Sequence, residues 1–158
     1  MSNIFAASEI VELAIEIEKN GREFYYALIR KSEFPKAQEI FQHLAIEEGR
    51  HILAFKKILN MVQRYNSESF SSEYLAYMSS LADGYIFTQK NTGEAAALKV
   101  QTDLQGIELG IGFEMDSVAF YEGMKKAVPD NEHKIIDEII NQEEGHLQQL
   151  LDLKKGLR

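Results

Sequence analysis

The sequence predicts an all-α protein, a four-helix bundle with one long crossover between its second and third helices. Four long stretches carry apolar residues at the helical spacings of three and four, and no stretch of useful length alternates as a β-strand does. The only two prolines, Pro35 and Pro129, each stand between two of these stretches. The 158 residues fit a single domain over 1–158, and an apolar share of 45% allows a sizeable core.

The first pair of helices is expected at about 8–30 and 35–64. Ser8 is a good N-cap residue, and Pro35 suits the first turn of a helix, where its missing N–H costs nothing. The inward stripe expected for the first helix is Val11, Ala14, Ile17, Gly21, Phe24, Tyr25 and Leu28. The stripe expected for the second helix is Ile40, Phe41, Leu44, Ala45, Phe55, Ile58 and Leu59. Each stripe is one face of a helix and predicts which side meets the bundle interior.

The crossover, about 65–102, is rich in Ser, Tyr, Asn and Gly. Short helices are expected within it at 71–81 and 93–100. Its aromatic residues are expected to cover the bundle or to form a dimer contact: Phe70, Tyr74, Tyr77, Tyr85 and Phe87.

The second pair of long helices follows the crossover. The third helix should begin near the candidate cap Asp103 and end near Ala127, and the fourth should span about 130–155. The three loops are thus short, long and short, which is the pattern of a bundle with one long crossover.

Composition excludes several classes of function. The net charge of −8 disfavours binding to nucleic acid, whose phosphates would be repelled. The absence of cysteine excludes disulfides, zinc–thiolate sites and iron–sulfur clusters. No stretch reaches the roughly 18 apolar residues that a membrane span needs, and the first residues do not resemble a signal peptide. We therefore expect a cytoplasmic protein that does not associate with membranes.

The two halves of the chain repeat a glutamate followed seven residues later by a tyrosine. The first helix carries Glu18 and Tyr25, and the third carries Glu114 and Tyr121; a phenylalanine precedes each tyrosine. Seven residues are close to two helical turns, so each glutamate shares a face with its tyrosine. Glu18 also lies four residues after Ala14, which places it on the apolar stripe.

A second repeat places a glutamate three residues before a histidine. The second helix carries Glu48 and His51, and the fourth carries Glu143 and His146. Three residues are about one helical turn, so both side chains of a pair point the same way and can grip one ion. Glu48 follows the inward Leu44 by four residues, so this pair also faces the core.

Six ionisable groups therefore interrupt apolar faces at about the same height in the bundle. Burying a carboxylate without a counter-charge costs several kcal/mol, and few Lys or Arg lie on these stripes. Two divalent cations would supply the missing charge. Carboxylate and imidazole together suit iron or manganese, and zinc is possible. The sequence thus predicts a centre of two metal ions, with the ligand formula known from dimetal carboxylate bundles.

On these motifs the sequence resembles the rubrerythrin and ferritin-like superfamily, over both helix pairs. The resemblance implies two iron ions per chain, with Glu48 and Glu143 bridging them. It implies as the full ligand set Glu18, Glu48, His51, Glu114, Glu143 and His146. It also implies oxidation of ferrous iron by oxygen or hydrogen peroxide, and reduction of peroxide.

The sequence departs from this resemblance at three points. Rubrerythrins proper carry a four-cysteine rubredoxin domain, and this chain has no cysteine. They also carry an extra glutamate one turn after the ligand of the third helix, where this chain has Ser117, so the centre is expected to be symmetric, as in bacterioferritins. Cage-forming ferritins have a fifth helix that is not seen here. We therefore expect a homodimer or small oligomer rather than a cage.

Several residues near the predicted ligands allow two interpretations. Tyr25 and Tyr121 are candidate catalytic residues that hydrogen-bond the ligands or are oxidised, or else they are core residues with satisfied hydroxyls. Gly21 and Ser117 leave space for oxygen or peroxide, or simply pack helices.

The neighbours of the ligands on the two Glu-x-x-His helices are expected to stay outside the centre. His43 should lie at the edge of the stripe and His133 in solvent. Glu47 and Glu144 point about 100° away from the adjacent ligands and should lie on the surface or behind them.

The leading functional hypothesis is a di-iron oxidoreductase of the ferroxidase or peroxidase kind, active in oxidative stress. Its partners would be hydrogen peroxide or oxygen and, for a peroxidase, a separate electron-donor protein. One alternative is a non-catalytic iron-binding or delivery protein that uses the same ligands. Another is a helical interaction module without metal.

Overall fold

The computed structural model describes residues 6–64 and 70–157, and the regular elements in these ranges are all helical. The α-helices are α1 (Ala7–Lys31), α2 (Pro35–Arg64), α3 (Ser72–Gly84), α4 (Thr92–Leu98), α5 (Asp103–Met124) and α6 (His133–Gly156). Three short 3₁₀ turns join them: η1 (Ile86–Thr88), η2 (Lys125–Ala127) and η3 (Asp130–Glu132). The predicted all-α fold with four long helices is confirmed.

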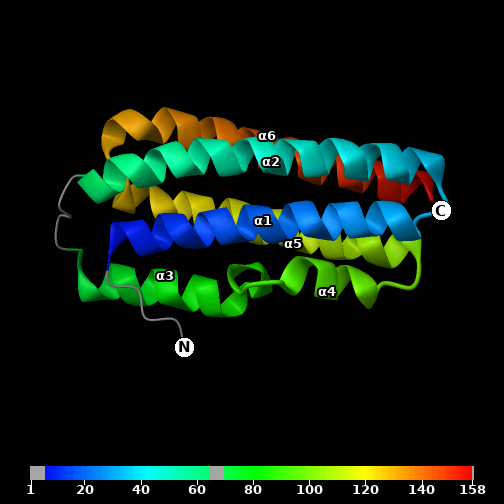
Figure 1. Cartoon of the computed structure of the whole chain (residues 1–158), viewed down its shortest axis with the longest axis horizontal. Coiled ribbons are helices and arrows are strands. Elements are labelled where there is room, and N and C mark those ends of the chain that lie inside the picture. Colours follow the sequence, from blue (N-terminus) through cyan, green and yellow to red (C-terminus); the bar gives the residue numbers. More distant parts are fainter. Residues whose placement is uncertain (1–5, 65–69, 158) are drawn as a thin grey trace.

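The long helices lie side by side along one axis (Figure 1). In this view α2 and α6 run along the top, α1 and α5 lie below them, and α3 and α4 run beneath. The most extensive packing joins α1 to α2 and α5 to α6. The crossover packs its α4 against α1 and its α3 against α5. It therefore covers the α1–α5 side, and none of the described elements covers the outer side of α2 and α6.

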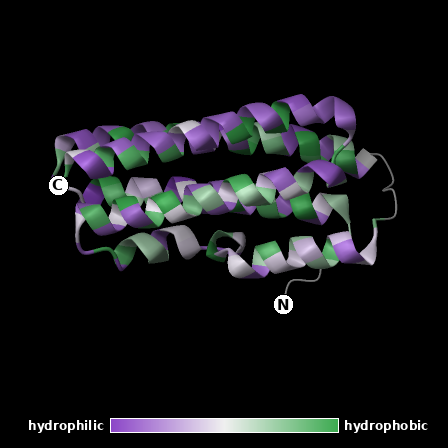
Figure 2. Cartoon of the chain, turned by 180° about the vertical axis from the view of Figure 1, so that it is seen from behind, coloured by the Kyte–Doolittle hydropathy of each residue, from purple (hydrophilic) through white to green (hydrophobic). Residues whose placement is uncertain are grey.

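The core follows the predicted stripes. Every residue of the stripe predicted for α1 is buried, and in α2 only Ile40 and Leu59, at the edges of the stripe, are half-buried. Hydrophilic and hydrophobic residues alternate around the long helices (Figure 2). None of the helices in the described ranges is both long enough and apolar enough to cross a membrane.

Two predicted helix caps are wrong. The helix α1 begins at Ala7, so Ser8 lies inside its first turn and does not cap it. The cap of α5 is Thr102, whose hydroxyl accepts a hydrogen bond from the Gln105 N–H at 3.1 Å. Asp103 is instead the first helical residue, where a negative charge interacts favourably with the helix dipole.

The crossover is more helical than predicted. The Ser71 hydroxyl caps α3, accepting from the Tyr74 N–H at 3.1 Å, and α3 runs on to Gly84 rather than ending at 81. The predicted helix at 93–100 is α4, which covers Thr92–Leu98, and η1 was not predicted. The residues 65–69 of the predicted crossover lie outside the described ranges.

One buried side chain of α1 fastens the crossover to the bundle. The amide nitrogen of Asn20 donates to the carbonyls of Phe87 and Gln89 at 2.7 and 2.8 Å. Its amide oxygen accepts from the N–H groups of Thr92 and Gly93 at 3.1 and 3.0 Å. Four backbone groups of the crossover therefore depend on this one residue.

The crossover aromatics divide between the core and the surface. Tyr85 and Phe87 are buried, Phe70 and Tyr74 are half-buried, and Tyr77 is 53% exposed. The expectation that they cover the bundle holds for Tyr85 and Phe87, and Phe70 and Tyr74 also pack against the core. The Tyr77 ring is exposed but lies beside Gly123 of α5, and the alternative of a dimer contact stays a prediction.

Candidate metal centre

The six predicted ligands meet inside the bundle, and each is at most 3% exposed. Glu18 comes from α1 and Glu114 from α5. The two Glu-x-x-His pairs come from α2 and α6 and enter from the opposite side. Four helices that are far apart in sequence thus bring their carboxylates and imidazoles to one place.

The six side chains form two overlapping groups that could each hold one ion. Glu18 and His51 form one group with Glu48 and Glu143, and the oxygen and nitrogen atoms concerned lie within 4.8 Å of one another. Glu114 and His146 form the other group with the same two glutamates. Glu48 and Glu143 thus lie where carboxylates shared by two ions would lie.

Six of these buried atoms have no hydrogen bond within the described part of the chain. The atoms without a hydrogen bond are Glu18 Oε2, Glu48 Oε1, Glu114 Oε2, Glu143 Oε1, Glu143 Oε2 and His146 Nδ1. Glu143 Oε1 does approach His51 Nδ1 to 2.8 Å, but not in hydrogen-bond geometry. Unpaired buried polar atoms are costly and rare in native proteins. A donor set of four carboxylates and two imidazoles with free lone pairs fits two divalent ions.

Two buried tyrosines, one on α1 and one on α5, each donate a hydrogen bond to the glutamate on the other helix. Tyr25 on α1 donates a hydrogen bond to Glu114 Oε1 on α5 at 2.8 Å. Tyr121 on α5 donates to Glu18 Oε1 on α1 at 2.7 Å. In each glutamate the held atom is Oε1, and Oε2 is the atom left without a partner. The tyrosines thus make the hydrogen bonds to Glu114 and Glu18 that were expected, and the role of these glutamates as ligands stays a prediction.

Both tyrosines remain protonated over the physiological range. Burial raises the pKa of Tyr25 well above its ordinary value, and the negative charge of Glu114 adds to this. Burial does the same for the pKa of Tyr121, helped by the charge of Glu18. The two hydroxyls are therefore permanent hydrogen-bond donors.

The histidines turn Nδ1 toward the carboxylates. His51 Nδ1 is 3.3 Å from Glu18 Oε1, and its Nε2 lies 2.5 Å from the amide oxygen of Gln142. The Nε2–H therefore donates to Gln142, which fixes the ring and, in the neutral form that can bind a metal ion, leaves the lone pair on Nδ1. His146 Nδ1 lies 3.5 Å from Glu48 Oε1 and 3.6 Å from Glu114 Oε1.

Gln142 is a functional residue that the sequence reasoning missed. It stands four residues before His146 and one before Glu143, but it serves His51 on the other helix. The sequence did carry a signal for it. In the internal repeat, Gln142 of α6 occupies the position that Glu47 occupies in α2, four residues before the histidine and one before the glutamate. Which histidine it reaches depends on how α2 packs on α6.

Without metal, the neighbouring carboxylates favour the charged histidines. Burial lowers the pKa of His51, but the charge of Glu18 and the hydrogen bonds to Glu18 and Gln142 together outweigh it and leave the pKa raised. Burial likewise lowers the pKa of His146, and its contact with Glu114 reverses the shift.

The pKa values of two glutamates in the centre, Glu143 and Glu114, shift in opposite directions. Burial raises the pKa of Glu143 well above its ordinary value, and the charges of Glu114 and Glu18 add to this. Burial also raises the pKa of Glu114, but interactions with His146, Glu143 and the Tyr25 hydroxyl outweigh it and leave the pKa lowered.

Gly21 and Ser117 do not leave open space beside the ligands. A Cβ on Gly21 would come within 3.3 Å of Glu48 Oε2, so this glycine makes room for the carboxylate itself. The Ser117 hydroxyl lies 2.8 Å from the hydroxyl of Tyr85, which also donates to the Phe113 carbonyl at 2.9 Å. Of the two interpretations left open by the sequence, the structure therefore favours packing, against Glu48 of α2 at Gly21 and against Tyr85 of the crossover at Ser117.

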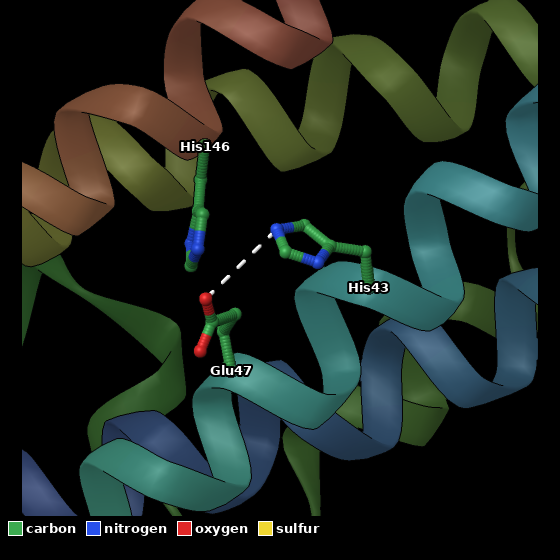
Figure 3. A group of neighbouring side chains, drawn as sticks. All are labelled: His43, Glu47 and His146. Atoms are coloured by element: carbon green, nitrogen blue, oxygen red, sulfur yellow. Dashed lines mark ion pairs between the residues drawn. The ribbon is translucent and has the colours of Figure 1, made fainter.

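Of the two remaining histidines, His133 differs from expectation, whereas His43 lies at the edge of the stripe as predicted. His133 was expected in solvent, but its Nε2 lies 2.9 Å from the Val128 carbonyl oxygen. His43 is half-exposed at the rim of the centre, with its ring 6.1 Å from the ring of His146. Glu47 lies between them and is 18% exposed in its side chain, behind the ligands as predicted (Figure 3). Glu144 is exposed, also as predicted.

A helical bundle whose core holds two groups of glutamates and a histidine defines a dimetal carboxylate protein of the ferritin-like class. The family model of rubrerythrin matches residues 9–154, and the chain belongs to the rubrerythrin family. Its fold is similar to that of a solved structure from Thermotoga maritima, described as a ferritin-like diiron-carboxylate protein. The two share 24% identity over 100% of both chains, with a TM-score of 0.69. No curated protein matches the sequence. Family and cluster together indicate a site for two metal ions.

Proposed function

We propose that this protein is a di-iron oxidoreductase that oxidises a bound ferrous pair with hydrogen peroxide or oxygen. The observation that carries the proposal is the pair of buried ligand groups that share Glu48 and Glu143. A surface that merely displayed carboxylates would not bury them without partners.

The six side chains divide naturally between two ions. Glu18 and His51 would hold one iron, Glu114 and His146 the other, and the two shared glutamates would bridge them. Glu143 suits a bridge because both of its oxygens are free of hydrogen bonds. When bound, the two ferrous ions supply one electron each to the oxidant.

The surrounding side chains hold the ligands in place. Tyr25 and Tyr121 fix one oxygen of Glu114 and Glu18 and leave the other oxygen for metal. Because both phenols stay neutral, they hold these carboxylates without adding charge to the centre. We assign them as the residues that position the reacting centre.

Repeated turnover needs electrons from outside the chain. With no cysteine, the protein has no thiolate-held redox group of its own. We therefore propose a separate electron-donor protein as partner. We also propose that the protein is a homodimer and acts in the cytoplasm. Light scattering tests the dimer, since a particle of twice the 18.0 kDa chain mass is expected rather than a large cage.

The activity is tested by a single turnover. The protein loaded anaerobically with ferrous iron should react once with hydrogen peroxide, oxidise about two irons per chain, and stop. Addition of NADH alone should not restart it, whereas a rubredoxin-type donor with its reductase should. No oxidation even in the first turnover would favour the alternative of iron binding or delivery without catalysis.

The ligand assignment is tested by two neighbouring glutamates. Glu143→Ala removes a proposed bridge, and Glu144→Ala removes an exposed carboxylate one position further along α6. Elemental analysis after iron loading should show clearly less iron in Glu143→Ala and an unchanged content in Glu144→Ala. Equal iron content in both variants would reject the assignment.

A further inference from the structure

We infer that His43 and Glu47, together with His146, form a third cation site at the rim of the dimetal centre. The ligand would be a divalent transition-metal ion. An ion held there lies between solvent and the buried pair. The inference rests on the proposed function in one respect, because His146 belongs to both sites. Its Nδ1, which faces the central carboxylates, would serve the pair, and its Nε2, after releasing its proton to solvent, would serve the outer ion.

The two new ligands share one face of α2. His43 and Glu47 are four residues apart, one helical turn, and point the same way toward His146 (Figure 3). His43 Nε2 and Glu47 Oε1 are 3.9 Å apart, beyond hydrogen-bond distance. Two ligands that each lie about 2.0–2.2 Å from one ion can be separated by up to about 4 Å, so this gap suits a shared ion. All three candidate ligand atoms lie within 4.8 Å of one another.

Glu47 keeps one oxygen available for an ion. Its Oε2 accepts a hydrogen bond from Arg50 Nη1 at 3.1 Å, whereas its Oε1 faces His43. The Arg50 side chain is 71% exposed, and an ion pair so open to water is weak. Arg50 therefore does not block the site.

The site connects the surface to the centre. The side chains of His43, Glu47 and His146 are 49%, 18% and 4% exposed, so exposure falls steadily inward. A cavity of about 600 Å³ between α2 and α6 is lined in part by Ile40, His43 and Asp152, so the outermost of the three ligands borders open space.

The opposite rim offers no such site. By the internal repeat, Glu138 and Gln142 stand eight and four residues before His146, as His43 and Glu47 stand before His51. Gln142 is uncharged, and its amide oxygen is engaged by His51 Nε2. The groups of potential ligands found among the described residues are the two central ones and the His43 group. The two halves of the repeat thus differ at these positions, and only the α2 half offers an exposed imidazole together with a carboxylate.

The inference is tested by titrating the metal-free protein with Zn²⁺ against a competing chelator. The wild type should bind a tight pair and one weaker equivalent. His43→Ala changes a half-exposed side chain and should keep the tight pair while losing the third equivalent. Glu138→Ala, the matched control at the repeat position, should keep all three. Circular dichroism verifies that each variant is folded.

The outcomes separate the new site from the proposed centre. A wild type that binds only the tight pair, or a third equivalent that survives His43→Ala, would overturn the outer site and leave the dimetal centre standing. Loss of the third equivalent in Glu138→Ala as well would also overturn it, since the binding would then be a general surface effect. A wild type without any tight pair would overturn both.

Discussion

At the scale of single residues, the tyrosine hydroxyls connect the two central helices. Each tyrosine sits on the same helix as one glutamate but donates to the glutamate of the other helix. Tyr121 and Glu18 are fully buried, so their hydrogen bond is not exchanged with water. A hydrogen bond to a buried charged group contributes more to stability than an exposed one.

Removing one hydroxyl should therefore weaken the metal-free fold. Tyr121→Phe leaves Glu18 Oε1 without its donor and should lower the free energy of unfolding by about 1–3 kcal/mol. Tyr26→Phe, a partly exposed tyrosine of the same helix as Tyr25, should change it by less than about 0.5 kcal/mol. Urea denaturation of both variants measures the difference, and equal losses would contradict the role given to the buried hydroxyl.

At the scale of elements, two glycines in helices meet very different surroundings. A Cβ on Gly93, at the start of α4, would lie 2.0 Å from the backbone oxygen of Asn20, so α4 can approach α1 only with glycine there. A Cβ on Gly145, in the middle of α6, would meet nothing within 4 Å. The first glycine is required by packing, and the second is not.

The two alanine substitutions should accordingly act in opposite directions. Gly145→Ala should raise the free energy of unfolding by about 0.5–1 kcal/mol, because alanine loses less backbone entropy in a helix. Gly93→Ala should lower it, because the added methyl group forces α4 away from α1 and strains the four hydrogen bonds of Asn20. Thermal unfolding of the metal-free proteins compares them; a stabilised Gly93→Ala would contradict the close packing of the crossover.

At the scale of the whole molecule, the charges of the centre couple stability to pH. The pKa values of His51, His146 and Glu143 are raised in the metal-free fold. Their contributions to the free energy of unfolding are complete below the pKa values of the unfolded chain, 6.5 for histidine and 4.5 for glutamate. They are lost as pH rises through the raised pKa values of the folded protein. The lowered pKa of Glu114 acts the other way, but its contribution is lost only below the ordinary value of 4.5.

Between about pH 5.5 and 8, the metal-free protein should therefore lose stability as pH rises. Bound metal should reverse this trend, because it replaces the protons on these ligands. Melting temperatures at both pH values, with and without metal, measure the effect. Glu143→Gln should flatten the metal-free slope, and Glu144→Gln should leave it unchanged. A chelated sample that melts no lower at the higher pH would contradict the assignment of these shifts.

The helical periodicity alone determined the fold class and the inward faces. Backbone hydrogen bonds within a helix are local, so spacings of three, four and seven residues specify which side chains share a face whatever the helix packs against. This is why all six buried Glu and His side chains, and the stripe of α1, could be predicted from the chain. The caps were less predictable. Thr102 and Asp103 are both suitable caps for α5, and α1 begins after Ala6 although Ser8 is the better cap residue, so only the backbone geometry before each helix decides where it starts.

The partners across helices were decided only by the tertiary structure. Whether Tyr25 reaches Glu18 or Glu114, and whether Gln142 serves His146 or His51, depends on the rotation and register of packed helices. Those quantities arise from the packing of side chains far apart in the sequence, and no local spacing encodes them. For the same reason Tyr85, carried by the crossover, came to occupy the space beside Ser117 that the sequence alone left open.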